Sequence, residues 1–410
     1  MATYSGEVDL SVLTELIEKT KTLQGDGTVS FQGFAHTEHL AILNTFVRLN
    51  SEIPESEGRR LINKACFETA ADGKVTAEAL LKRINRLERT YLATRKKRFR
   101  LVTSISIGSL KNPIIVKTSD CHITYGWKSS QTAGTERAKK ILDASRSING
   151  HPPNNYAAVS CIVSARNPEE AATIALDQID IFRSIWNLWL NRGLGIRISS
   201  GRRQPVNSFR LGPIHTVHLP SGRLATDEWW YDPNFTEPMR PWHQPQRIAN
   251  MMLFTKRVRT SISKLPYRPQ IEAALIRYSR ALDLSDWNSS ILQLWSILEL
   301  LTGTTLGENH KVTVRRSAFL FRNHDYASLT LNHLRTYRNN AIHTGKESWQ
   351  IETLVFQVKN FVETLLNFHL SRAGEFSSLA DVAQFLDQPP GIEELDRQLK
   401  LLRNVRRFIA

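Results

Sequence analysis

Hydrophobic residues recur at intervals of three and four along the first hundred residues, which is typical of amphipathic helices. The breaks in this pattern are rich in glycine, proline and aspartate and lie at residues 25–27, 53–54 and 72–73. The clearest helix follows Thr76, a favourable N-cap residue. Residues 1–98 are therefore predicted to form a helical region. A cluster of five cations at residues 95–100 is either a solvated helix end or a contact to an RNA backbone.

Beyond residue 98 the composition shifts to β-branched residues, which predicts strands. The expected strands cover residues 99–107, 113–117, 122–125 and 157–165, with a short helix at 135–145. Asn167 is a predicted N-cap for a helix that runs to about Leu190. Residues 191–265 lack a regular pattern and interleave Trp, Arg and Pro, either for stacking on RNA bases or for packing against a neighbouring domain. The whole of 99–265 is predicted to be a mixed α/β region with a small sheet.

From residue 267 to the end the pattern is helical again. The predicted helices cover residues 272–284, 286–302, 312–322, 328–343 and 347–369, followed by two short ones. The chain as a whole is thus expected to be α+β and mostly α-helical. Its helical C-terminal domain is placed at residues 266–375, with residues 376–410 packing on it.

One helix of this domain turns a charged side chain toward apolar surroundings. On a helical wheel, Leu331, Leu334, Ala341 and Ile342 share a face, and Arg338 lies in its middle, while Asn339 and His343 lie on a flank. A buried guanidinium requires a partner. Glu299 is the best-placed candidate, because it belongs to a thin polar stripe on an otherwise buried helix. The plain alternative is that Arg338 forms a structural ion pair and His343 is a cation at a helix end.

The stretch Arg338-Asn339-x-x-x-His343 resembles the Arg-x4-His signature of HEPN domains. The segment DWNSSILQLWSILELLTG, residues 286–303, is similar to the Trp- and Glu-bearing helix of the Apea-like branch of that family. The resemblance covers about residues 266–375. It implies an all-helical domain that pairs with a copy of itself and acts as a metal-independent endoribonuclease. Many active members carry a further polar or acidic residue nearby, which has no recognisable counterpart in this sequence.

These residue types suit RNA cleavage on chemical grounds as well. RNA supplies its own nucleophile, the 2′-hydroxyl, so the protein must move protons and stabilise a phosphate. Histidine transfers protons near neutral pH, and arginine presents a fixed fork of donors to phosphate oxygens. The expected roles are phosphate stabilisation by Arg338, proton transfer by His343, orientation by Asn339 and support of Arg338 by Glu299. Four further cations are expected to follow the RNA backbone: Arg315, Arg316, Arg335 and Lys346.

An inactive HEPN module for RNA binding or dimeric assembly is the alternative that these residues leave open. A DNA-binding regulator is disfavoured, since no helix-turn-helix with a basic recognition helix is evident. The resemblance also implies an antiviral-defence or toxin-like effector. In such a protein residues 1–265 would sense a phage-derived or nucleic-acid trigger.

Charge and composition support a nucleic-acid partner. The chain carries a net charge of +15 with a pI near 9.8, which favours polyanions. No glycine-rich phosphate loop is present, and Cys66, Cys121 and Cys161 are far apart and unpaired with His, so no cofactor, metal or disulfide is expected. No apolar run reaches ~20 residues and no leader pattern is evident, so a cytoplasmic protein without a membrane segment is expected.

Overall fold

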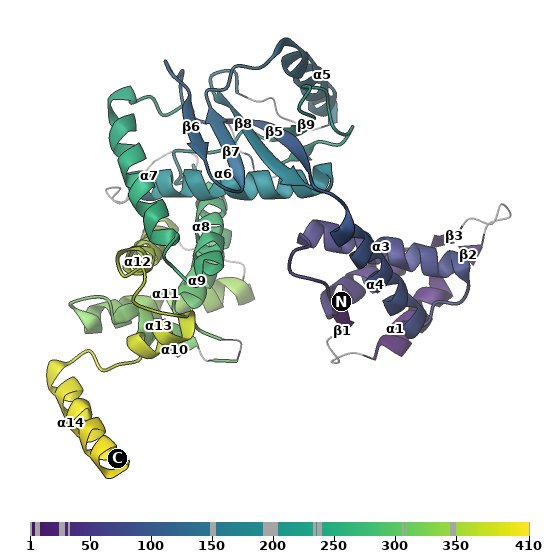
Figure 1. Ribbon diagram of the computed structural model, residues 1–410. Coiled ribbons are helices and arrows are strands. Elements are labelled where there is room, and N and C mark those ends of the chain that lie inside the picture. The colour runs from purple at the N-terminus through teal and green to yellow at the C-terminus, as the bar shows by residue number, and fades with distance from the viewer. Residues whose placement is uncertain are drawn as a thin grey trace.

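The protein is α+β and mostly α-helical, as the sequence predicts (Figure 1). The computed structural model describes residues 2–4, 9–23, 29–31, 33–147, 153–191, 204–232, 235, 240–305, 307–308, 310–344 and 350–409, without the side chains of 145–147 and 341–344. Within these residues the chain forms a helical N-terminal unit, a six-stranded sheet and a C-terminal helical bundle.

The N-terminal unit is built from four helices around one apolar core. They are α1 (Leu10–Thr20), α2 (Phe34–Phe46), α3 (Glu55–Asp72) and α4 (Ala77–Ala93). Thr76 caps α4 as expected, since its hydroxyl accepts a hydrogen bond from the amide of Ala79. Two small antiparallel pairs were not predicted: β1 (Thr3–Tyr4) with β4 (Val47–Arg48), and β2 (Lys21–Leu23) with β3 (Val29–Phe31). Their strands are too short to show an alternating pattern.

The sheet has the order β10-β9-β5-β8-β7-β6, and each neighbouring pair is antiparallel. Its strands are β5 (Lys97–Ile105), β6 (Ile114–Lys117), β7 (Cys121–Tyr125), β8 (Ala157–Ala165), β9 (Ile214–His218) and β10 (Trp230–Tyr231). The helix α6 (Pro168–Asn191) covers one face, and α5 (Gln131–Ser147) lies beside β9 (Figure 1). Asn167 caps α6 by accepting from the amide of Glu170 at 2.8 Å, as predicted. The cluster at 95–100 is not a helix end, because β5 begins at Lys97.

Residues 191–265 are more regular than the sequence suggests. They contribute β9, β10, the 3-10 turn η1 (Pro245–Arg247) and the helix α7 (Ile248–Ile262). The strand β9 escaped detection because all five of its residues are buried, so it shows no alternation of apolar and polar side chains. The prediction of an irregular segment was wrong for these parts.

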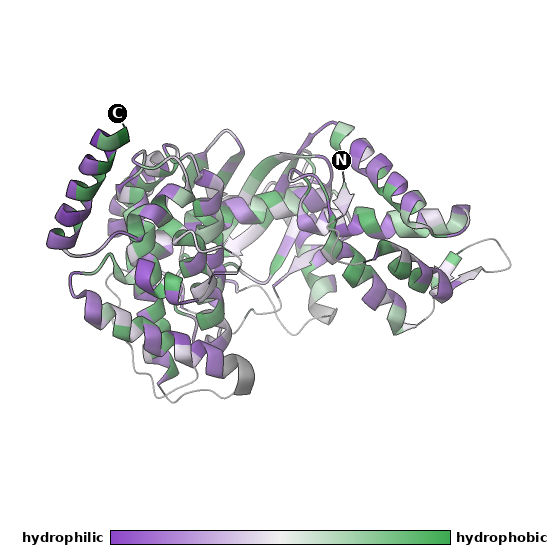
Figure 2. Ribbon diagram, turned by 90° about the horizontal axis from the view of Figure 1, so that it is seen from below, coloured by the Kyte–Doolittle hydropathy of each residue, from purple (hydrophilic) through white to green (hydrophobic). Residues whose placement is uncertain are grey.

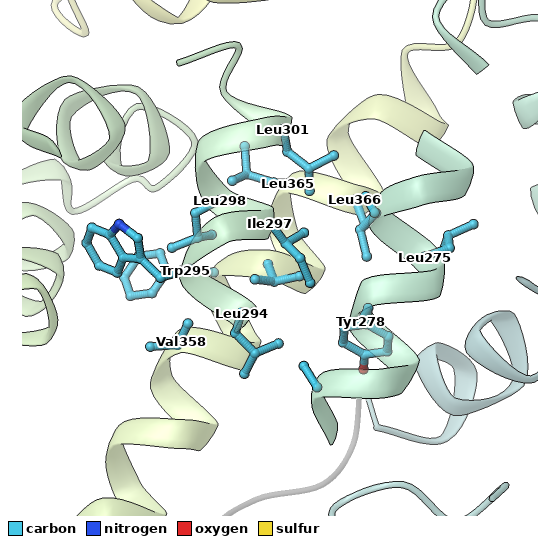
Figure 3. Close-up of a cluster of buried hydrophobic side chains, with 14 of the residues drawn as sticks. Leu275, Tyr278, Leu294, Trp295, Ile297, Leu298, Leu301, Val358, Leu365 and Leu366 are labelled. Atoms are coloured by element: carbon cyan, nitrogen blue, oxygen red, sulfur yellow. The ribbon is translucent and has the colours of Figure 1, made fainter. Parts of the chain in front are cut away.

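The C-terminal bundle contains α8 (Arg268–Asp283), α9 (Trp287–Leu301), α10 (His310–Ala318), α11 (His324–Thr344), α12 (Ile351–Ser371) and α13 (Leu379–Leu386). Leu294, Ile297 and Leu366 lie at its centre, where α8, α9 and α12 meet (Figure 3). The same core includes Ile185 of α6 and Val258 of α7. The boundary expected at residue 265 is therefore not a break in packing, since the mixed region and the bundle share one core.

The last helix departs from expectation. The helix α14 (Ile392–Ile409) is long and has no buried residue, and it extends away from the bundle (Figure 1). Hydrophobic and hydrophilic residues alternate along this helix (Figure 2). Its apolar side chains Leu402 and Phe408 are exposed. In contrast, α13 buries Val382 and Leu386 in the bundle. Within the described residues, α13 therefore packs on the bundle, whereas α14 does not.

His369 gives the bundle a predicted sensitivity to acid. It is buried, its Nε2 donates to the carbonyl of Leu301 at 2.9 Å, and its Nδ1 accepts from the hydroxyl of Tyr267 at 3.2 Å. Burial lowers the pKa of His369 to about 4. At pH values between about 4 and the unfolded pKa of about 6.5, His369 is protonated in the unfolded state and neutral in the folded state. Stability is expected to fall as pH drops through that window, by on the order of 3 kcal/mol in total, and to be unaffected by this group above it.

The measurement is the free energy of unfolding between pH 4 and pH 7.5 for the wild type and for His369→Gln, because glutamine keeps an N–H donor for the carbonyl of Leu301 and does not titrate. The variant should lose part of the acid slope. His333→Gln, a change at an exposed position of α11, serves as control and should keep it. Equal slopes for His369→Gln and the wild type would contradict the prediction.

Candidate functional site

The helices α9, α10 and α11 together present the predicted Arg338 and its neighbours. Asp286 caps α9, since its carboxylate accepts from the amide of Asn288 at 3.1 Å. Leu331 and Leu334 are fully buried, so α11 turns the face predicted from the sequence toward the bundle. Arg338, on that face and one turn beyond Leu334, is consequently only partly exposed.

A hydrogen-bonded chain of side chains runs through the site. Nη1 of Arg338 lies 3.2 Å from Nε2 of His310 and donates to Oδ1 of Asn339 at 3.1 Å. Since a guanidinium only donates, Nε2 of His310 must accept, and a neutral His310 then carries its proton on Nδ1. That Nδ1 lies 2.8 Å from Oε1 of Glu299. The carboxylate therefore holds the imidazole in one orientation and one tautomer.

Glu299 supports Arg338 indirectly, which corrects the expected direct pairing. Its Oε1 accepts from His310 and also from the indole Nε1 of Trp295 at 3.0 Å, and within the described residues it makes no ion pair with Arg338. The physical reason is that His310 lies between the two groups. Sequence reasoning missed His310, because it is the first residue of a short helix and no periodic pattern marks it.

The turn between α9 and α10 positions His310. The hydroxyl of Thr304 bonds to those of Thr302 and Thr313, at 2.8 and 3.1 Å, which ties the start of α10 to the end of α9. Gly303 has a φ of 62°, and a Cβ there would lie 2.7 Å from the carbonyl oxygen of Leu379. Glycine is therefore required where α13 packs against this turn.

Two of the predicted RNA-binding cations serve another purpose. Arg316 is buried, and its Nε and Nη2 donate to the carboxylate of Asp387 at 2.9 and 2.8 Å. Arg315 bonds to the same carboxylate, and both arginines, Arg316 first, lower the pKa of Asp387. These residues fasten α10 to the end of α13. Arg316 as an RNA contact was wrong, and Arg315 is engaged in this ion pair; their partner is about seventy residues away in sequence and no local pattern reveals it.

Of the predicted residues not yet placed, only Arg335 has a described side chain. Arg335 is partly exposed and makes no hydrogen bond or ion pair to another described residue. The backbone of His343 lies in the last turn of α11, whereas its side chain, Lys346 and the expected cap Gly345 lie outside the described residues. The structure thus brings together Arg338, Asn339 and Glu299, and adds His310.

This arrangement combines a phosphate-binding group with a proton acceptor. The side chain of His310 is 39% exposed, so the imidazole is open to solvent. A carboxylate on Nδ1–H directs the Nε2 lone pair at the fork of Arg338, and this lone pair becomes free to act as a base when Arg338 turns its donors to another group. No cluster of three or more His, Cys, Asp or Glu side chains within the described ranges is arranged to hold a metal ion. No helix in these ranges has both the length and the hydrophobicity that crossing a membrane requires.

No model of a known protein family matches the chain, and neither a curated protein nor a solved structure matches it. Any functional assignment must therefore rest on the residues of the site and their geometry.

Proposed function

We propose that the protein is a metal-independent endoribonuclease of HEPN type, and that its domain is Apea-like. The observation that carries this proposal is the chain from Glu299 through His310 to Arg338, which places an oriented imidazole beside a guanidinium. Such a pair matches the two needs of RNA cleavage by the 2′-hydroxyl, namely removal of a proton and stabilisation of the phosphate.

In the proposed reaction, Arg338 turns its donors from His310 to the phosphate when RNA binds, and Asn339 keeps the guanidinium in place. The freed Nε2 of His310 takes the 2′-hydroxyl proton while the 2′-oxygen bonds to phosphorus. The bond to the 5′-oxygen breaks, and a protonated His343 supplies that oxygen with a proton. The products are a 2′,3′-cyclic phosphate and a 5′-hydroxyl. Pairing of two copies through residues 266–375, which the resemblance implies, would place two such sites in one cleft.

The test is incubation of the purified chain with RNA in EDTA, followed by analysis of the product ends. Cleavage with cyclic phosphate ends is expected. Arg338→Lys should slow it about tenfold to hundredfold, because lysine loses one charge-assisted hydrogen bond of ~1.5–3 kcal/mol to phosphate. Arg322→Lys, the same change at an exposed position just beyond α10, should cleave normally. Dependence on added metal, or products with a 3′-hydroxyl, would refute the proposal.

The alternative is an inactive module for RNA binding or dimeric assembly. The observation in its favour is α14, whose apolar side chains remain exposed and are suited to association. Binding of RNA without cleavage under any tested condition, in a chain that forms dimers, would favour this alternative over the enzyme.

The same proposal includes a cytoplasmic antiviral-defence or toxin-like role, with residues 1–265 sensing a phage-derived or nucleic-acid trigger. The shared core of α6, α7 and the bundle supports this role, because a conformational change at the sheet could reach the site through side chains that are in contact. Growth arrest of cells that express the wild type, and normal growth with Arg338→Lys, would be consistent with an RNA-degrading effector.

A further inference from the structure

The face of the sheet opposite α6 carries a row of basic residues. The register pairs His218 with Arg100, Arg100 with Ile162, Ile162 with His122, and His122 with Lys117. Residues directly opposite each other in a sheet point to the same side, so these five form one line across β9, β5, β8, β7 and β6. The alternate positions of the same strands form the apolar core under α6. Four of the five side chains in the row are therefore Arg, Lys or His on a face that this core does not use.

Most of this row is open. At the β9 end α5 covers the sheet, where Arg137 donates to the carbonyl of Val102 and the hydroxyl of Thr216. Toward β6 the side chains are partly or fully exposed. Arg98 lies two residues before Arg100 on β5 and shares its face. We name the open part the basic sheet face, and it consists of Arg98, Arg100, Lys117 and His122.

The positive charge of the basic sheet face is not neutralised. None of its four side chains makes an ion pair with a carboxylate of the described residues. The pKa of His122 is lowered by burial and by the nearby cations Lys117, Arg100 and Arg98, and its Nε2 has no hydrogen-bond partner among these residues. Arg98, Arg100 and Lys117 carry like charges that repel one another, so an anion bound there is attracted by all three at once.

An aromatic platform adjoins the cations. The guanidinium of Arg100 lies over the ring of Trp127, 5.2 Å from its centroid, while its Nη1 donates to the hydroxyl of Ser160 at 2.8 Å. Trp127 also lines a hollow of about 630 Å³. Its other lining residues include Asn154, Asn155, Tyr156, Arg240 and His243. Aromatic rings stack on bases, and amide and guanidinium groups bond to base edges.

We propose that the basic sheet face binds single-stranded RNA, with phosphates along the cations and a base held at Trp127. Neighbouring strands are about 4.8 Å apart, so the row from Arg100 to Lys117 spans about 14 Å. Stacked nucleotides rise about 3.4 Å each, so this length accommodates about four phosphates. A sheet face does not enter the major groove of a duplex as a helix does, whereas it suits unpaired bases that stack. This site is separate from Arg338 and does not depend on cleavage.

The experiment measures binding of the full chain to a fluorescent single-stranded 2′-O-methyl RNA, which lacks the nucleophile and cannot be cut. Arg98→Gln with Lys117→Gln should weaken binding at least tenfold. Loss of two phosphate contacts should also reduce the slope of log affinity against log salt by about 1.4. Trp127→Ala should weaken binding roughly 5- to 150-fold. The control, Lys264→Gln with Arg277→Gln, removes the same charge from exposed positions in the turn before α8 and on α8, and it should bind as the wild type does.

Equal losses in the double variant and its control would overturn the inference, because net charge alone would then explain binding. So would tighter binding of duplex than of single-stranded RNA, or capture of an acidic peptide in place of RNA. The outcome is distinguishable from that for the nuclease. If the wild type cuts no RNA but Arg98→Gln with Lys117→Gln abolishes RNA binding, the RNA-binding sheet face is supported and the nuclease proposal is refuted. If the wild type cuts RNA and this double variant binds RNA normally, the nuclease proposal is supported and the RNA-binding sheet face is refuted.

Discussion

Exchange of His310 for alanine is expected to slow RNA cleavage by about 10²- to 10⁴-fold, the usual contribution of a positioned general base. In the proposed reaction Nε2 of His310 removes the 2′-hydroxyl proton, and no other described side chain bonds to both Glu299 and Arg338. The measurement is the single-turnover rate on a short RNA at saturating enzyme. Saturation separates the chemical step from any loss of RNA binding.

The matched control is His333→Ala, which removes an exposed histidine from α11 and should leave the rate unchanged. Glu299→Gln should have a smaller effect than His310→Ala, since the amide oxygen still accepts from Nδ1–H but carries no negative charge. The thermal midpoints of all three variants should stay close to that of the wild type, because His310 and His333 reach solvent. A His310→Ala enzyme that cleaves at the wild-type rate would remove His310 from the mechanism.

The presence of His310 means that a second copy of the chain is not needed to supply a second catalytic histidine. The Arg-x4-His motif contains one histidine, His343, so with this histidine alone a separate base and acid would have to come from two paired copies. A second histidine from α10 lets one chain supply both roles. Activity that is independent of protein concentration would then be compatible with the proposed chemistry, and pairing would serve substrate binding or regulation.

Local chemistry explains which elements were predictable. The strand β8 has the bounds expected from its run of small and β-branched residues, and α6 begins behind Asn167 because its cap and first-turn glutamates are adjacent in sequence. The sequence predicts the face of α11 that carries Arg338, but it does not predict the contacts that Arg338 makes. Leu331, Leu334 and Arg338 follow from helical periodicity, but the contact between Glu299 and His310 depends on how the turn at Gly303 folds back. The ion pair of Arg316 with Asp387 depends likewise on packing between distant helices.

Replacement of Arg183 by methionine is expected to lower the free energy of unfolding by about 3–5 kcal/mol, as when one partner of a buried ion pair is removed. Arg183, on α6, is buried and bonds to Asp180 of the same helix and to Asp283 at the end of α8. Burial raises the pKa of Asp283, and Arg183 and Arg210 oppose that rise. Without Arg183, part of this compensation is lost while both carboxylates stay out of water.

Arg280 provides a matched control, because it also bonds to Asp180 but is more exposed than Arg183. Arg280 bonds to Asp180 and Asp177, but its side chain is 50% exposed, so Arg280→Met should cost at most about 1 kcal/mol. Adding Asp283→Asn to Arg183→Met should recover part of the loss, because it removes the buried charge that has lost its nearest cation and keeps only the more distant Arg210. Urea unfolding followed by tryptophan fluorescence measures all three. Equal losses for Arg183→Met and Arg280→Met would mean that burial does not decide the strength of these pairs. A large loss confined to Arg183→Met would show that the buried ion pairs at the junction of α6 and α8 contribute strongly to the stability of the fold.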